Sequence, residues 1–285
     1  MKNIFYLLRV NHWTKNLFIF AVPFFHGEIF DLATFANLSS SFFLFCLISS
    51  IVYIFNDIID RNDDKTNLKF KYRPLASGDI EFKNVIIILA ILIFGAIVII
   101  LIGTVSLSTL YFIFLYLGIN FFYTIYLKKV IFLEIFLVSS GFVIRLYIGS
   151  FATNIDPSSW IVICTWLLSL FMIIGKRLSE VNSGYSRKVL QHYNYSHLIN
   201  ALKVIYILIV LTYIFYSIDP ITIKKFETYI LFTIPFVIFG MYYYLKLLIN
   251  MKVKEEPTTL IFKNKILFST GILWLFVFML IIYIK

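Results

Sequence analysis

The chain has 285 residues, of which 61% are hydrophobic, 19% are aromatic and only 14% are charged. No single soluble core could absorb this much apolar surface, so the composition excludes an ordinary soluble protein and predicts an integral membrane protein whose partner is the bilayer. The formal net charge is +10, but the cations are spread over short loops without a recognition fold, which argues against nucleic acid as a partner.

Long apolar runs recur along the chain in place of the alternating pattern of a membrane β-barrel. The stretch from Val85 to Leu101, for example, is almost unbroken. Because a membrane helix needs about 17 to 25 residues, we expect an all-α bundle of nine spans that forms one polytopic domain over residues 1–285. In chain order, the spans are centred on Ala21, Ile48, Ala96, Leu115, Ile144, Leu167, Val210, Val237 and Phe276.

Lysines and arginines gather in alternate loops. They lie before the first span and within residues 61–83, 128–129, 176–203 and 252–265, whereas residues 103–106 and 151–159 have none. Because cytoplasmic loops carry the excess of cations, the pattern predicts a multi-pass protein of the cell membrane with its N-terminus and basic loops in the cytoplasm and its C-terminus outside. Residues 1–16 are too polar for a cleavable signal peptide, so we expect the first span to be retained.

The first basic loop contains a run of acidic residues. The pattern N-D-x-x-D-x-x-x-D, formed by Asn56, Asp57, Asp60 and Asp64, directly follows the second span in a chain with only 15 acidic residues. If the helix of that span continues, the three aspartates are spaced i, i+3 and i+7 and share one face. Carboxylates this close repel one another unless a cation lies among them.

Mg²⁺ is the cation that this pattern favours, because it takes oxygen ligands and is usually held by one or two carboxylates plus substrate phosphates. The motif therefore predicts a Mg²⁺ site for a phosphate-bearing substrate, in which Asn56 orients a ligand or a bound water. A polar loop that only faces solvent is the simpler alternative.

The same residues resemble a known family signature. Tyr53 to Asp64, followed by Lys71 and by R-P-L-A-S-G over residues 73–78, is similar to the first signature of the UbiA superfamily of intramembrane prenyltransferases. Within it, the chain resembles the decaprenyl-phosphate phosphoribosyltransferases. The further matching positions are Arg9, Trp13, Lys15, Asn16, Tyr123, Leu127, Lys128, Gly141, Phe142, Arg145, Gly149, Ser169, Leu170, Phe171, Met172, Gly175, Lys176, Arg177, Glu180, Arg187, Leu190 and Tyr193.

The resemblance implies a bundle of nine helices whose catalytic loops, about residues 56–83, 123–134 and 175–203, face the cytoplasm. It also implies a Mg²⁺-dependent enzyme that transfers 5-phosphoribosyl from phosphoribosyl diphosphate to a polyprenyl phosphate and releases diphosphate. In that reaction Asp57, Asp60 and Asp64 would hold Mg²⁺, which would act on the diphosphate as a Lewis acid and a template.

Cationic side chains would neutralise the two phosphorylated substrates. Arg145 stands inside an apolar span, where a charge is costly and usually faces a polar cavity, so we expect it in the catalytic set together with Lys128. The expected substrate-binding residues are Lys15, Asn56, Arg73, Tyr123, Lys176, Arg177 and Glu180.

The chain departs from the family patterns in two ways. Ordinary UbiA prenyltransferases carry a second Asp-rich motif after the sixth span, but residues 172–202 contain no aspartate. Lys176, Arg177 and Glu180 stand there instead, which favours the phosphoribosyl branch. Glu134 stands where that branch often has an aspartate, so the role of this position is open.

Two alternative functions stay open. One is a UbiA-type prenyltransferase that moves a polyprenyl chain from an allylic diphosphate to an aromatic acceptor. The other is a transporter or lipid carrier with a structural divalent ion, although the chain shows no repeated halves. The sequence does not indicate the isoprenoid length, the pathway of the lipid product or the oligomeric state.

Overall fold

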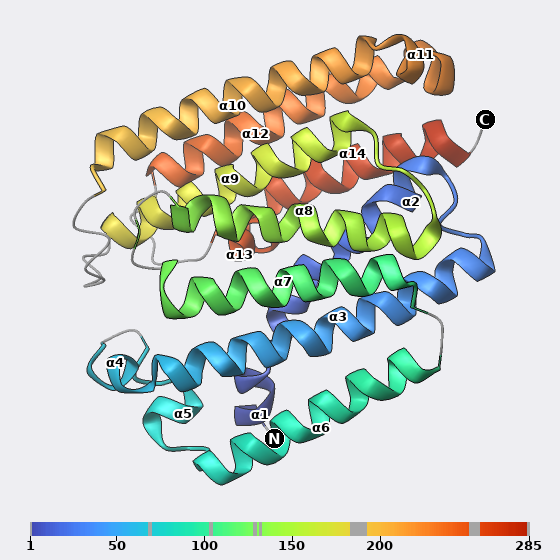
Figure 1. The fold of residues 1–285 in the computed structure, drawn as a ribbon. Helices are drawn as coiled ribbons and strands as arrows, with labels where there is room; N and C mark the ends of the chain where they lie inside the picture. Colours follow the sequence, from blue (N-terminus) through green and yellow to red (C-terminus); the bar gives the residue numbers. More distant parts are fainter. Residues whose placement is uncertain are drawn as a thin grey trace. The chain divides into compact units, whose positions relative to one another are not determined.

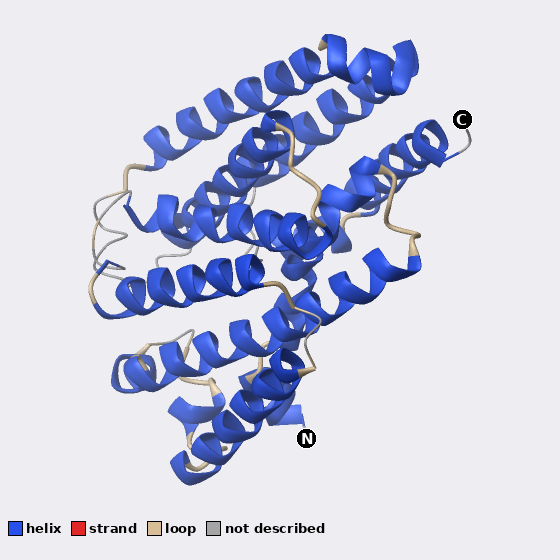
Figure 2. Cartoon of the chain, turned by 45° about the vertical axis from the view of Figure 1, so that its right-hand side comes forward, coloured by secondary structure: helices blue, strands red, loops and turns tan. Residues whose placement is uncertain are grey.

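The structure is a computed structural model that describes residues 2–67, 70–102, 105–127, 130, 133–182, 193–250 and 257–283. Within these ranges every regular element is helical (Figures 1 and 2). Eight of the described segments are long and apolar enough to cross a membrane, and each contains one of the predicted span centres from Ile48 to Phe276. The predicted all-helical membrane fold is confirmed, while the count of nine spans and the sides of the two termini stay predictions.

The chain divides into two compact units, Met1–Pro157 and Ser158–Lys285. The single polytopic domain over residues 1–285 therefore stays a prediction. The first unit contains α1 (Lys2–Leu7), η1 (Val10–Phe20), α2 (Ala21–His26), α3 (Leu32–Ile59), α4 (Arg61–Thr66), α5 (Pro74–Ser77), α6 (Phe82–Leu101), α7 (Leu107–Ile125) and α8 (Leu133–Thr153).

Helix α3 is central to the first unit and packs against α6, α7, α8 and η1. Figure 1 shows it beside α6 and α7. Its N-terminus is capped by Asp31, whose carboxylate accepts a hydrogen bond from the backbone N–H of Thr34 at 2.8 Å. The facing sides of these helices bury one apolar cluster that includes Leu44, Phe45 and Ile148. This packing fixes the direction in which α3 carries its polar C-terminal end.

The segment centred on Ala21 differs from the other predicted spans. It is a 3₁₀ helix, η1, followed by the short α-helix α2, so the expected single long helix is not formed there. Long 3₁₀ runs are uncommon and need support from their surroundings. One support is a close approach to α8: a Cβ added to Gly149 would lie 1.8 Å from the backbone oxygen of Ile19. Only glycine leaves room for this contact.

The outer face of α6 is apolar. Ile86, Ile91 and Phe94 are exposed on it, with relative exposures of 47%, 64% and 69%. Because such a surface would be unfavourable in water and matches lipid chains, it supports the assignment of α6 as a membrane span.

The second unit contains α9 (Ser159–Asn182), α10 (Tyr195–Ile218), α11 (Pro220–Phe226), η4 (Glu227–Thr233), α12 (Ile234–Asn250), α13 (Pro257–Lys263) and α14 (Lys265–Tyr283). Within this unit α10 packs against α9 and α12, and α12 packs against α14. Helices α9 and α12 also touch where Gly175 meets Leu248: a Cβ on Gly175 would lie 2.8 Å from a methyl carbon of Leu248. This contact supports the α9 turn that begins with Lys176.

Candidate active site

The acidic motif lies at the C-terminal end of α3 and continues into α4. The backbone N–H of Asp60 donates to the oxygen of Asn56 at 2.9 Å, and the N–H of Asp64 donates to the oxygen of Asp60 at 2.8 Å. The α-helical spacing is therefore kept across the junction of the two helices. As a result, Asn56, Asp60 and Asp64 follow one another at intervals of four residues along one face.

The R-P-L-A-S-G stretch forms a tight turn that positions Arg73. Pro74 occupies the first position of α5, and Gly78 ends this helix with φ 87°, a left-handed conformation that glycine adopts without strain. The hydroxyl of Ser77 donates to the backbone oxygen of Arg73 at 3.0 Å. Since both ends of the turn are fixed, the Arg73 side chain is directed back toward α3 and α4.

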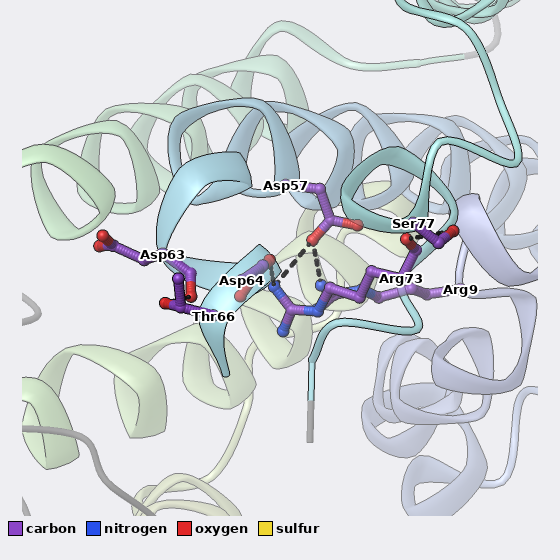
Figure 3. A network of polar contacts seen from close by, with 7 residues as sticks. All are labelled: Arg9, Asp57, Asp63, Asp64, Thr66, Arg73 and Ser77. Atoms are coloured by element: carbon purple, nitrogen blue, oxygen red, sulfur yellow. Dashed lines mark hydrogen bonds and ion pairs between the residues drawn. The ribbon is translucent and has the colours of Figure 1, made fainter. Parts of the chain in front are cut away.

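Arg73 joins two of the three motif aspartates (Figure 3). One guanidinium nitrogen lies 2.7 Å from Asp64 Oδ2 and 3.2 Å from Asp57 Oδ1. Arg9 approaches Asp57 from the N-terminal segment, with Nη2 2.5 Å from Oδ1. Asp63 lies next to Asp64 on α4, but its side chain points away from Asp57, Asp64 and the two arginines in Figure 3. We call Arg9, Asp57, Asp64 and Arg73 the acid–arginine cluster.

Burial makes the charges of this cluster interdependent. The Asp57 side chain is 3% exposed and that of Arg73 is 14% exposed. Burial raises the pKa of Asp64, Arg73 opposes this effect, and the carboxylates of Asp60 and Asp57 raise the pKa further. The three aspartates therefore interact electrostatically, as their spacing predicted, and Arg73 supplies positive charge among them.

The two carboxylates of this cluster are of the kind that Mg²⁺ takes as ligands. Among the described residues no three His, Cys, Asp or Glu side chains are arranged around one point as metal ligands. Instead, two carboxylates converge on the guanidinium of Arg73, which occupies the position of a cation. Two oxygen ligands of this kind, together with phosphate oxygens, match what Mg²⁺ requires. The full set of Asp57, Asp60 and Asp64 as ligands stays a prediction.

Asn56 is held by a residue that the sequence analysis did not single out. Thr124, in the last turn of α7, is 1% exposed, and its hydroxyl is within hydrogen-bonding distance of the Asn56 side-chain amide. The same oxygen lies 2.7 Å from the backbone oxygen of Asn120. Asn56 is thus tied to the end of a helix that begins 51 residues further along the chain, at Leu107.

A row of polar contacts fastens the N-terminal segment to α3. The indole N–H of Trp13 donates to the hydroxyl of Ser50 at 3.1 Å, and this hydroxyl donates to the backbone oxygen of Leu8 at 2.9 Å. Arg9, at the start of η1, has the left-handed backbone conformation with φ 50°, and its guanidinium lies 4.7 Å from the ring centre of Tyr53. These contacts place the Arg9 side chain on Asp57.

Arg145 has a different environment from the one expected. It is 4% exposed, and its Nε donates to Asn16 Oδ1 at 2.9 Å. The rings of Phe45, Tyr116 and Phe142 surround the guanidinium, with their centres 5.0, 5.4 and 5.3 Å away. The predicted polar cavity is therefore replaced by an aromatic cage among the described residues. Its Nη1 donates to the backbone oxygen of Gly141 at 2.7 Å, so the charge is enclosed by aromatic rings, one amide and one backbone oxygen.

The remaining predicted site residues lie in several elements. Lys15 is half-buried on η1, Tyr123 precedes Thr124 on α7, and Glu134 is buried in the first turn of α8. Lys128 lies outside the described residues. Lys176, Arg177 and Glu180 lie on α9 in the second unit, where Arg177 and Glu180 form a buried ion pair.

Comparison with known proteins gives the family of the chain. The model of the UbiA prenyltransferase family matches residues 17–266. The chain belongs to this family. A relative named decaprenyl-phosphate phosphoribosyltransferase, from Mycolicibacterium smegmatis, is 32% identical over 67% of this chain and 62% of its own length. A protein of the same name from Corynebacterium glutamicum is 29% identical over 67% of this chain and 60% of its own length.

A solved structure has the same fold. It is that of a UbiA homolog from Archaeoglobus fulgidus bound to DMAPP and Mg²⁺, which is 16% identical, covers 99% of both chains and has a TM-score of 0.70. This UbiA-family chain spans less than two thirds of the length of the two named relatives. Its eight apolar segments and its family together identify it as a multi-pass membrane protein.

The sequence analysis did not identify Arg9 and Thr124 as residues of the candidate site. Arg9 was noted only as part of the resemblance, and Thr124 was not noted at all. The signal for Arg9 is a cation directly after the short apolar run of residues 4–8. Thr124 gave no signal, because an isolated threonine near a helix end is common and its partner is 68 residues away.

Proposed function

We propose that the chain transfers a 5-phosphoribosyl group from phosphoribosyl diphosphate to a polyprenyl phosphate. The observation that carries this proposal is the acid–arginine cluster, in which the motif carboxylates Asp57 and Asp64 share one guanidinium. A site with these charges suits a diphosphate that arrives with a divalent cation. The relatives named as phosphoribosyltransferases support this donor over an allylic diphosphate.

In the proposed reaction, a phosphate oxygen of the acceptor lipid forms a bond to the anomeric carbon of the donor. The bond from that carbon to the diphosphate oxygen breaks, and its electron pair leaves with the diphosphate. The acceptor phosphate is already an anion at neutral pH, so the site must position it and needs no general base. When bound, Mg²⁺ would stabilise the charge on the departing diphosphate as a Lewis acid.

The residues of the chain have separate roles in this proposal. Asp57, Asp60 and Asp64 hold the cation. Arg73 and Arg9 then exchange their carboxylate partners for phosphate oxygens, since a guanidinium binds both kinds of anion in the same geometry. The further phosphate-binding or ribose-binding residues are Lys15, Asn56, Tyr123, Lys128, Lys176, Arg177 and Glu180.

We also propose that this site faces the cytoplasm at the cell membrane. The basic loops on the same side as the acidic motif support this orientation. The water-soluble donor would enter from the cytosol, and the isoprenoid tail of the acceptor would stay in the bilayer.

The test is transfer of radiolabel from phosphoribosyl diphosphate into organic-extractable lipid by purified protein with a polyprenyl phosphate and Mg²⁺. The variant is Asp60→Asn, and its matched control is Asp63→Asn, which makes the same change of charge three residues away at an exposed position. We expect Mg²⁺-dependent transfer by wild type and Asp63→Asn, and a loss of about 100-fold or more in Asp60→Asn, as for other groups that stabilise developing charge.

Three outcomes would contradict the proposal. Labelled lipid that forms equally well with Asp60→Asn would remove Asp60 from the site. Turnover only with an allylic diphosphate and an aromatic acceptor would move the chain to the prenyltransferase branch. Flux of polyprenyl phosphate across liposomes without any product would indicate a transporter or lipid carrier.

A further inference from the structure

Thr124 makes two contacts through one hydroxyl group. Its oxygen Oγ1 lies 2.7 Å from the backbone oxygen of Asn120 and within hydrogen-bonding distance of the side-chain atom that the structure places as Asn56 Oδ1. The residue is 1% exposed, so no bulk water competes for these contacts. The two helices that it connects, α3 and α7, pack directly against each other.

The number of protons decides how the amide of Asn56 is oriented. A threonine hydroxyl has one proton, and a carbonyl oxygen can only accept. Two oxygens 2.7 Å apart need a proton between them, so the hydroxyl donates to Asn120. With Oδ1 of Asn56 next to Thr124, three oxygens would share that single proton. Turning the amide by about 180° removes the conflict, because its N–H group then donates to Thr124 Oγ1.

In this orientation Thr124 contacts the amide nitrogen of Asn56, and the amide oxygen remains available to a ligand. Asn56 is half-buried, and within the described residues the structure gives its side chain no second partner. It shares a helical face with Asp60 and Asp64. An amide N–H directed at these carboxylates would occupy them, whereas an amide oxygen adds another acceptor beside them. Such a group of oxygens favours a cation.

We propose that Thr124 is a positioning residue that turns the Asn56 amide so that its oxygen serves the cation site of the motif. This inference rests on the proposed function only in assuming that the site takes a divalent cation and a diphosphate. The identity of the group transferred does not enter it. Thr124 acts through Asn56 and does not itself touch the substrate.

The test measures Mn²⁺ binding to purified protein by electron paramagnetic resonance in the presence of inorganic diphosphate. Thr124→Val keeps the shape of the side chain and removes the hydroxyl, and Thr124→Ser keeps the hydroxyl. We expect Thr124→Val to weaken Mn²⁺ binding by about 10-fold or more, the usual effect of losing a residue that orients a ligand. Thr124→Ser should stay within about 2-fold of wild type, since the same hydrogen bond can form.

A double-mutant cycle with Asn56→Ala separates positioning from a general structural effect. If Thr124 acts through Asn56, Thr124→Val has no further effect on Mn²⁺ binding once Asn56 has been replaced. Thermal unfolding of all variants is measured alongside. Equal weakening by Thr124→Val in both backgrounds, unchanged binding in Thr124→Val, equal losses in the valine and serine variants, or a wild type that binds no Mn²⁺ would each overturn the inference.

The proposed function and this inference can fail separately. If no label from phosphoribosyl diphosphate reaches lipid but the valine and serine variants still differ in Mn²⁺ binding, only the proposed function is lost. If label is transferred and the two variants bind Mn²⁺ equally, only the role of Thr124 is lost.

Discussion

Two arginines of the first unit, the half-buried Arg73 and the buried Arg145, have opposite surroundings. Arg73, directly before α5, meets the carboxylates of Asp57 and Asp64. Arg145, within α8, meets three aromatic rings, the amide of Asn16 and the backbone oxygen of Gly141. A guanidinium between carboxylates can exchange them for phosphate, since both are anions, whereas one enclosed by rings has no anion to exchange. We therefore expect the first arginine to serve binding and the second to fix the positions of helices.

The largest loss of stability is expected from a substitution at the contact between η1 and α8, near Arg145. Gly149→Ala would bring a Cβ to 1.8 Å from the backbone oxygen of Ile19, so one of the two helices must move. We expect a loss of about 3 kcal/mol in the free energy of unfolding, at the upper end for overpacking, because backbone cannot rotate away as a side chain can. Unfolding by denaturant in detergent measures it.

The matched control for Gly149→Ala is Gly118→Ala in α7. Among the described residues, and apart from its chain neighbours and its own helix backbone, nothing lies within 4 Å of a Cβ added at Gly118. This change should therefore be neutral or slightly stabilising. Equal stability of the two variants would show that η1 is not held against α8 as described.

Replacing Arg73 and Arg145 by lysine in turn tests whether the two residues have different roles. Lysine keeps the charge but loses the planar fork and its stacking. Arg73→Lys should lower label transfer by about 10- to 100-fold, or about 1.4 to 2.7 kcal/mol, with little change in unfolding. Arg145→Lys should lower the free energy of unfolding by about 1 to 3 kcal/mol, because it loses a charged hydrogen bond and aromatic contacts. Its KM for the donor should not change.

Steady-state kinetics and unfolding curves on the same two preparations check this pair. A large rise in KM with unchanged stability in Arg145→Lys would place that residue at the substrate after all. Reduced stability with normal kinetics in Arg73→Lys would make the acid–arginine cluster a structural ion pair.

The sequence predicted what depends on local patterns. Apolar runs predicted the eight long segments, and the local motif with its R-P-L-A-S-G ending pointed to Arg73 as a candidate site residue. The 3₁₀ form of η1 could not be predicted in this way. It is held by contacts such as Trp13 to Ser50 and Asn16 to Arg145, whose partners are 37 and 129 residues apart. The aromatic cage of Arg145 has the same origin, since its rings come from three helices.

The smallest expected change in stability is at Arg9, a charged residue in an unfavourable backbone conformation. Its guanidinium meets Asp57 at 2.5 Å, while its φ of 50° lies in the left-handed region. Arg9→Gly and Arg9→Ala both remove the guanidinium and differ mainly in the backbone. The left-handed conformation costs alanine about 1 kcal/mol, so the glycine variant should be the more stable by somewhat less than that, as glycine also loses more entropy on folding.

Thermal unfolding of the two Arg9 variants measures this difference, expected at about 2 °C for a chain of this size. Label transfer should fall equally in both, because both lack the same ion pair to Asp57. If transfer instead differed between them while unfolding did not, the left-handed backbone itself would be needed for the reaction. Arg9 would then serve the site through the path of the N-terminal segment and not through its charge.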